Sequence, residues 1–342
     1  MSAQPSRLAW IDVLRGVAVV GMVETHVVHT FLSAEHDEAL WLQHLNFYNG
    51  LVASTFLWIA GYVQGLAMRS AQAKQRPVAT ARRWRRLGLV ALIGYLMHAP
   101  WWQWLQGDFG PETWSILFQV DILQCMAFSL GLLLCVGALF GHWLLDAVTL
   151  FLALASIFLA PYAAGWTTGL VPVDMFLNSN GGSLFPLFPW VGFCAAGCLA
   201  SRWEPSWKVY VPVSLALMAA GYYLAPDFWS KSHPAFFAER LGYMGMLIAA
   251  VCLVSRWLAP KWLQLAGRES LFVYVAHLVI LFTLPVAGLP QQGIPLNIAI
   301  GRTLQLPAVA GMFAAVLGIC LALAYLNEKR KRRDAPVVSN RA

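Results

Sequence analysis

The chain has 342 residues, of which 59% are hydrophobic and only 11% are charged. Soluble domains carry about 25% charged residues, so this composition excludes an ordinary soluble protein and indicates an integral membrane protein. The net charge of +7 does not indicate nucleic-acid binding, because the basic residues gather in the short loops between apolar segments and in the C-terminal tail.

Ten apolar segments are candidate membrane spans, since a helix that crosses a bilayer needs about 20 apolar residues. We therefore predict an all-α fold, a polytopic integral membrane helix bundle with about ten transmembrane helices. One transmembrane domain is expected over residues 1–328, followed by a basic cytoplasmic tail over 329–342. The candidate spans are 10–32, 48–70, 87–105, 116–139, 143–160, 184–201, 207–225, 241–258, 270–288 and 307–327.

The distribution of basic residues predicts the orientation of the chain. With ten spans and a cytoplasmic N-terminus, 20 of the 23 Lys and Arg residues fall on the cytoplasmic side. This is the positive-inside pattern, so both termini are expected to be cytoplasmic. The run from Lys329 to Arg333 is then expected to be an orientation signal that contacts lipid headgroups rather than a partner-binding site. The run from Arg82 to Arg86 is either a similar flank or a seat for the phosphates of a cytosolic cofactor.

The cysteines and the outer loops give weaker signals. All six cysteines lie in predicted spans, which is typical of small core residues rather than of a disulfide framework or a zinc site, and no metal is expected. The outer loops around 174–182 and 227–233 carry aromatic residues and Asn. These loops either contact a sugar or anchor the chain at the membrane interface.

The first apolar segment contains several ionisable residues. A charged group at mid-membrane costs roughly 2.5–3.5 kcal/mol, so such groups normally line a protected interior. Asp12 and Arg15 are three residues apart and can pair on one helix face. His26 lies fourteen residues beyond Asp12, close to four helical turns, so it shares that face at a distance of about 21 Å along the axis. His29 continues the same stripe, whereas Glu24 is rotated from His26 by about 200°.

Later segments add further polar groups. Tyr274 and His277 lie three apart in the ninth span, and Arg268 precedes them at its inner end. Because imidazole titrates near neutrality, His26 and His277 are candidates for proton transfer. Either of two carboxylates, Glu24 or Asp121, is expected to orient the imidazole. The remaining polar residues of interest are His98 in the third span and Gln119 and Gln124 in the fourth.

Five motifs, in order, carry a resemblance to a known family. They are Ile11–Ala18 with His26, Phe56–Tyr62, Asp121–Gln124, Phe188–Gly192 and Gly267–His277. The chain resembles the transmembrane acyltransferase superfamily, in particular the bacterial heparan-alpha-glucosaminide N-acetyltransferase-like group, which is related to the acyltransferase-3 proteins. The resemblance implies transfer of an acyl group, usually acetyl from acetyl-CoA, across a bacterial cytoplasmic membrane to an extracytoplasmic sugar or glycan.

The resemblance also implies roles for individual residues. His26 matches the catalytic His, and Asp12 and Arg15 match the first-helix motif. In the lysosomal enzyme the catalytic His follows the first helix, so His36 and His44 are alternatives to His26. The expected catalytic set is His26, Glu24, Asp121 and His277. The residues expected to bind acyl-CoA or the acceptor are Asp12, Arg15, Arg82, Arg83, Arg86, Gln124, Arg268 and Tyr274.

A second class of function is consistent with the same residues. A line of buried Asp, Arg, Glu and His is also typical of a proton relay, so the alternative is a proton-coupled transporter or exporter of a small polar solute. Within the acyltransferase interpretation, the donor is acetyl-CoA or succinyl-CoA. Transfer is either direct or through an acyl-His intermediate.

Overall fold

The computed structural model describes residues 9–224, 231–255, 257–284 and 295–334. Within these ranges the chain is helical, and its strand-like pairing is a single isolated β-bridge between Leu32 and Leu304. The end of the predicted tail, residues 335–342, and residues 227–230 of a predicted outer loop lie outside the described residues.

Fifteen α-helices and one short 3-10 helix make up the described residues. They are α1 (Ala9–Phe31), η1 (Ala34–His36), α2 (Leu40–Ala73), α3 (Ala81–His98), α4 (Trp101–Leu105), α5 (Pro111–Phe118), α6 (Ile122–Leu139), α7 (His142–Ala163), α8 (Val171–Leu177), α9 (Leu187–Ala200), α10 (Trp207–Leu224), α11 (Pro234–Val254), α12 (Lys261–Arg268), α13 (Ser270–Phe282), α14 (Leu296–Ile300) and α15 (Leu306–Arg333). This confirms the all-helical prediction.

Five of the described helices are long and apolar enough to cross a membrane: α2, α6, α7, α11 and α15. The pair α12 and α13 adds a sixth if it is one broken span, since the two helices meet at an angle of 83°. These helices define a polytopic membrane protein. The count of ten spans and the cytoplasmic position of both termini stay predictions.

Several predicted spans contain breaks that the hydropathy pattern did not indicate. The predicted span 87–105 ends as a helix at His98, because Pro100 disfavours helical backbone at the residue before it. The predicted span 116–139 is divided between α5 and α6, and Asp121 caps α6 by accepting a hydrogen bond from the backbone N–H of Ile122. Apolar content therefore predicted where helices lie but not where they stop.

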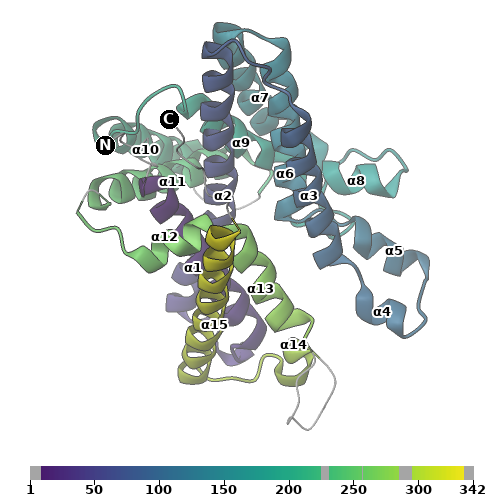
Figure 1. Ribbon diagram of the computed structural model, residues 1–342. Helices are drawn as coiled ribbons and strands as arrows, with labels where there is room; N and C mark the ends of the chain where they lie inside the picture. The colour runs from purple at the N-terminus through teal and green to yellow at the C-terminus, as the bar shows by residue number, and fades with distance from the viewer. Residues whose placement is uncertain (1–8, 225–230, 256, 285–294, 335–342) are drawn as a thin grey trace. The chain divides into compact units, whose positions relative to one another are not determined.

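The chain divides into two compact units. The first comprises residues 1–52 and 253–342, and the second comprises residues 53–252. In the first unit α1 packs against α12, α13 and α15, and Figure 1 shows the yellow α15 running beside purple α1 and green α13. In the second unit α7 packs against α9 and α3 against α6. Sequence-distant segments thus form the first unit around α1.

Two glycines bring the backbones of α1 and α12 together. A Cβ at Gly267 would lie 1.9 Å from the carbonyl oxygen of Asp12, and one at Gly16 would lie 2.1 Å from that of Leu263. Small residues of this kind allow membrane helices to approach closely. The contact brings the start of α1, with Asp12, against the end of α12, with Arg268.

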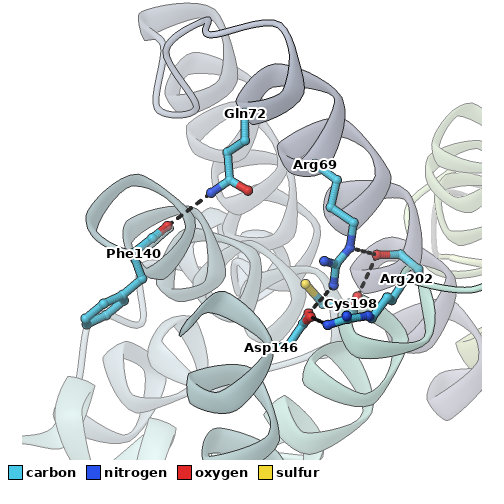
Figure 2. A network of polar contacts seen from close by, with 7 residues as sticks. Arg69, Gln72, Phe140, Asp146, Cys198 and Arg202 are labelled. Atoms are coloured by element: carbon cyan, nitrogen blue, oxygen red, sulfur yellow. Dashed lines mark hydrogen bonds and ion pairs between the residues drawn. The ribbon is translucent and has the colours of Figure 1, made fainter. Parts of the chain in front are cut away.

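An ion-paired cluster joins three helices of the second unit. Arg69 of α2 and Arg202, which follows α9, both donate to the carboxylate of Asp146 on α7, as Figure 2 shows. Arg69 also donates from Nε to the hydroxyl of Ser201 at 3.1 Å. Asp146 is 9% exposed. Such a buried carboxylate needs both cations, so the cluster fixes the relative positions of the three helices.

Candidate active site

Two imidazoles from distant parts of the chain meet in the first unit. His26 lies on α1 and His277 on α13, with 3.3 Å between Nδ1 of His26 and Nε2 of His277. Their ring centroids are 5.0 Å apart, and the ring planes are tilted by 55°. His277 is completely buried, while His26 is partly exposed. The sequence prediction named both residues, and the structure brings them into contact.

The hydrogen-bond network assigns the tautomers of this pair. Nδ1 of His277 lies 2.9 Å from the carbonyl oxygen of Val273, which can only accept, so this nitrogen carries the proton. Nε2 of a neutral His277 is then an acceptor facing His26. Nδ1 of His26 also lies 2.9 Å from the carbonyl oxygen of Met22, and it therefore carries a proton as well. This leaves Nε2 of a neutral His26 as the basic nitrogen.

Aromatic side chains surround the imidazole pair. The ring of Tyr274 lies edge-on to His277 with centroids 5.6 Å apart, and Tyr274 is 7% exposed. The ring of Phe282 lies edge-on to His26 at 6.2 Å. These contacts restrict the orientation of both imidazoles and limit the access of water to His277.

Glu24 lies in a different environment from His26, as its rotation around the helix predicted. Its carboxylate is half-buried, lies beside Asn49 and interacts electrostatically with His29. Glu24 Oε1 and Asn49 Nδ2 are both buried, and the carboxylate and the amide interact with one another. The sequence predicted that a carboxylate orients the imidazole of His26. In the structure, Nε2 of His277 faces Nδ1 of His26 and can orient it instead.

The alternative histidines lie near the ends of α1 and α2. His29 is exposed and 2.8 Å from Oδ1 of Asn46. His36 is 3.2 Å from Oε1 of Gln305, and its ring packs against Trp41. His44 is exposed. The geometry thus gives His26 a buried imidazole neighbour, whereas His36 and His44 lie in more exposed surroundings.

A polar cavity of about 630 Å³ lies at the other end of α1. It is lined by Asp12 from α1, by Gln264 and Arg268 from α12, and by residues near the end of α15. Nε of Arg268 donates to Oε1 of Glu328 at 2.8 Å. Asp12 is 5% exposed, and Arg15 is half-buried one turn away. Cationic side chains here are suited to hold phosphate groups.

The predicted arginine run divides into side chains with different contacts. Arg83 donates to the backbone carbonyls of Val78 and Ala67, so its guanidinium supports the turn between α2 and α3. Arg82 lines a second cavity, of about 590 Å³, in the second unit. Arg86 is exposed on α3. Of the three predicted arginines, Arg83 therefore has a structural role.

The remaining predicted residues belong to the second unit. Asp121 caps α6, and Nε2 of His98 lies 2.9 Å from Oε1 of Gln119. Gln124 is 1% exposed, and both of its amide atoms are buried without a hydrogen-bond partner among the described residues. Gln124 packs against Gly94 of α3.

Sequence reasoning missed several polar residues. Glu269 accepts from Nζ of Lys331 at 2.7 Å and from Nδ2 of Asn327 at 2.8 Å, and Glu328 pairs with Arg268. Asp146 was also missed, although a carboxylate inside an apolar run is a readable signal. The pairing of Glu269 with the basic end of α15 had no signal, because 62 residues separate Glu269 from Lys331.

The fold and this site define a polytopic membrane protein with two imidazoles in contact on separate helices, one of them completely buried. The catalytic-domain family of heparan-alpha-glucosaminide N-acetyltransferase matches residues 7–226. The chain belongs to this family of membrane acetyltransferases, in which acetyl-CoA is the donor. The match includes α1 with His26 and ends before α13 with His277. No curated protein matches the chain.

Proposed function

We propose that this protein transfers an acetyl group from cytosolic acetyl-CoA to a hydroxyl or amine of a sugar or glycan on the far side of a bacterial cytoplasmic membrane. The observation that carries the proposal is the contact between His26 and His277. Family membership supports the acetyl donor and the class of reaction. The acceptor class, the membrane and the roles of individual residues are our inference.

His26 acts as the general base in this proposal. Its Nε2 takes the proton of the acceptor hydroxyl or amine while the acceptor heteroatom attacks the thioester carbonyl carbon. Collapse of the tetrahedral intermediate breaks the C–S bond and releases the CoA thiolate, which recovers the proton from Nε2 of His26. His277 holds the imidazolium by accepting from its Nδ1–H, much as a carboxylate does in a catalytic triad.

The polar cavity at Asp12 is the proposed donor seat. Arg268, Lys331 and Arg332 line it and would bind the phosphates of CoA. Asp12 and His26 share a face of α1 at a separation of about 21 Å, so an extended pantetheine arm would follow the helix toward the imidazole. The donor and the acceptor would then approach His26 from opposite ends of α1. The binding of acyl-CoA by Arg82 and Arg86 stays a prediction.

Acetyl transfer by purified single-histidine variants tests the proposal. The protein is incubated with acetyl-CoA and a hexosamine acceptor, and release of CoA is followed by mass spectrometry. We expect His26→Ala to lower the rate by about 10²–10⁴. The matched controls, His36→Ala and His44→Ala, should keep most of the activity.

Different outcomes would contradict different parts of the proposal. Loss of activity in His36→Ala or His44→Ala, with activity kept in His26→Ala, would move the base to that residue. Proton-coupled solute flux in liposomes without any dependence on acetyl-CoA would favour a transporter instead. A rapidly quenched reaction that carries an acetyl mass on His26 would replace direct transfer with an acyl-His route.

A further inference from the structure

A second cavity lies in the other unit, between the end of α2 and the start of α3. Its volume is about 590 Å³. Cations and hydroxyl groups line it, namely Lys74, Arg76, Arg82, Arg83, Ser70 and Thr80, together with small apolar side chains. Among the described residues that line it, none is acidic. We propose that this cavity binds a phosphate group.

The charge of this cavity differs from that of the cavity at Asp12. There, Arg268 pairs with Glu328 and Lys331 pairs with Glu269, so a bound phosphate would share these cations with carboxylates of the protein. Here, no ion pair involves Lys74, Arg76 or Arg82 in the described part of the chain. Neighbouring cations without counter-charges repel one another, and a bound anion relieves that repulsion.

The walls of the cavity are held in place without its ligand. Arg83 donates to the carbonyls of Val78 and Ala67, which ties the connecting loop to α2. Val78 is 7% exposed and packs against Gly137 of α6. Nε2 of Gln72 donates to the carbonyl oxygens of Gly137 and Phe140, each at 3.1 Å, and Figure 2 shows the contact to Phe140. A preformed arrangement of donors lowers the entropic cost of binding.

Phosphate fits the chemistry of these donors. Its oxygens accept hydrogen bonds from ammonium and guanidinium groups at short range, and hydroxyl groups such as those of Ser70 and Thr80 add further donors. Helix α2 has 34 residues and is therefore about 51 Å long, whereas the hydrocarbon core of a bilayer is about 30 Å thick. The end of α2 is thus suited to lie at the level of lipid headgroups. The phosphate group would then come from an anionic phospholipid, and the alternative source is a soluble nucleotide.

Binding to two pairs of charge-removing variants tests the site. The pocket variant, K74Q/R76Q, removes one Lys and one Arg that line the cavity. The matched control, R85Q/K208Q, removes one Lys and one exposed Arg of the same unit that do not line it. Each purified protein is titrated with short-chain phosphatidylglycerol, with phosphatidylcholine of the same chain length, and with adenosine 3′,5′-bisphosphate.

We expect the pocket variant to bind phosphatidylglycerol about tenfold more weakly than the natural sequence, since each cation near a membrane surface contributes appreciably to anion affinity. The control should stay within about twofold of the natural sequence. Loss confined to adenosine 3′,5′-bisphosphate in the pocket variant would also support the phosphate site but assign a soluble nucleotide as its ligand. Because this compound is the nucleotide portion of CoA, that result would also move the phosphates of CoA from the cavity at Asp12 to this one. Equal losses in both variants, or no loss in the pocket variant, would overturn the proposal. Because no acetyl transfer is measured, the outcome is independent of the role of His26.

Discussion

Nε2 of His277 lies 3.3 Å from Nδ1 of His26, although 251 residues separate the two in sequence. Together with the carbonyl oxygen of Met22, this contact gives the imidazole of His26 a defined tautomer without a carboxylate. In the proposed mechanism His277 is a positioning residue: its own Nδ1–H is donated to the carbonyl oxygen of Val273, which leaves its Nε2 to accept from His26. Activity should therefore depend on the ability of residue 277 to accept a hydrogen bond.

Substitutions of His277 test this dependence. We expect His277→Ala to lower kcat by about 10²-fold with little change in KM for acetyl-CoA, since the base loses its orientation but the donor seat is intact. His277→Gln should recover part of the loss, because its amide oxygen can accept from Nδ1–H of His26. Equal activities for the Ala and Gln variants would contradict the positioning role.

Substitution of Arg268 tests the donor seat. Arg268→Gln should raise KM for acetyl-CoA by about tenfold and leave kcat nearly unchanged, because a charge-assisted contact to phosphate is lost far from the reacting carbon. The KM of Arg268→Lys should lie between that of the natural sequence and that of Arg268→Gln, since lysine keeps the charge but lacks the planar guanidinium. A fall in kcat alone would place Arg268 outside donor binding.

The cluster around Asp146 predicts a large effect on stability. Asp146→Ala leaves Arg69 and Arg202 without their shared carboxylate, and we expect a loss of about 3 kcal/mol in the free energy of unfolding. Thermal unfolding in detergent measures the loss. The control is Asp334→Ala, whose exposed pair with Arg330 should contribute less than about 1 kcal/mol. Comparable losses for the two variants would show that the buried cluster is no stronger than a surface pair.

The close approach of α1 and α12 predicts that a single methyl group destabilises the first unit. Gly267→Ala places a Cβ against the carbonyl oxygen of Asp12, where only backbone movement can make room. We expect a loss of about 1–3 kcal/mol or more. Gly88→Ala is the matched control, because a Cβ at Gly88 meets no atom within 4 Å, and it should be neutral or slightly stabilising. An unchanged melting temperature for Gly267→Ala would contradict the packing.

The loop after α1 predicts a pH dependence. The Arg302 guanidinium beside Asp37 lowers the pKa of that carboxyl below its ordinary value of 3.8. A carboxyl with a lowered pKa in the folded state stabilises the fold above its ordinary pKa, and the contribution disappears as the pH falls through the lowered value. The melting temperature of Asp37→Asn should thus fall below that of the natural sequence near neutral pH and converge with it in strong acid. If the two melting temperatures still differ in strong acid, a contact other than the ion pair of Asp37 with Arg302 causes the difference.

The sequence predicted the elements of the site better than their contacts. Helical periodicity placed Asp12 and His26 on one face of α1, and the structure has Asp12 at a polar cavity and His26 at a second imidazole. The partner of His26 could not be read from periodicity, because the pairing depends on how α13 packs against α1. His277 itself was predicted from the sequence, as a second imidazole on a separate apolar segment, but not as the contact of His26.

Residue type alone also does not distinguish the contacts that individual cations make. A run of arginines predicts phosphate binding equally at each position, yet Arg83 supports the turn through the carbonyls of Val78 and Ala67. Likewise, at the basic end of α15, which is predicted to be an orientation signal, Lys331 also pairs with Glu269. Backbone carbonyls and distant carboxylates compete for the same guanidinium and ammonium groups, and only the folded chain decides between them.

The two glycines at which α1 and α12 touch, Gly16 and Gly267, can be used to recognise related sequences. Neither Gly16 nor Gly267 leaves room for any side chain. Related proteins that keep the close packing of α1 against α12 should therefore keep glycine at both positions. A search that requires glycine at both sites together with the two histidines would separate proteins built on this architecture from those that carry only the opening motif.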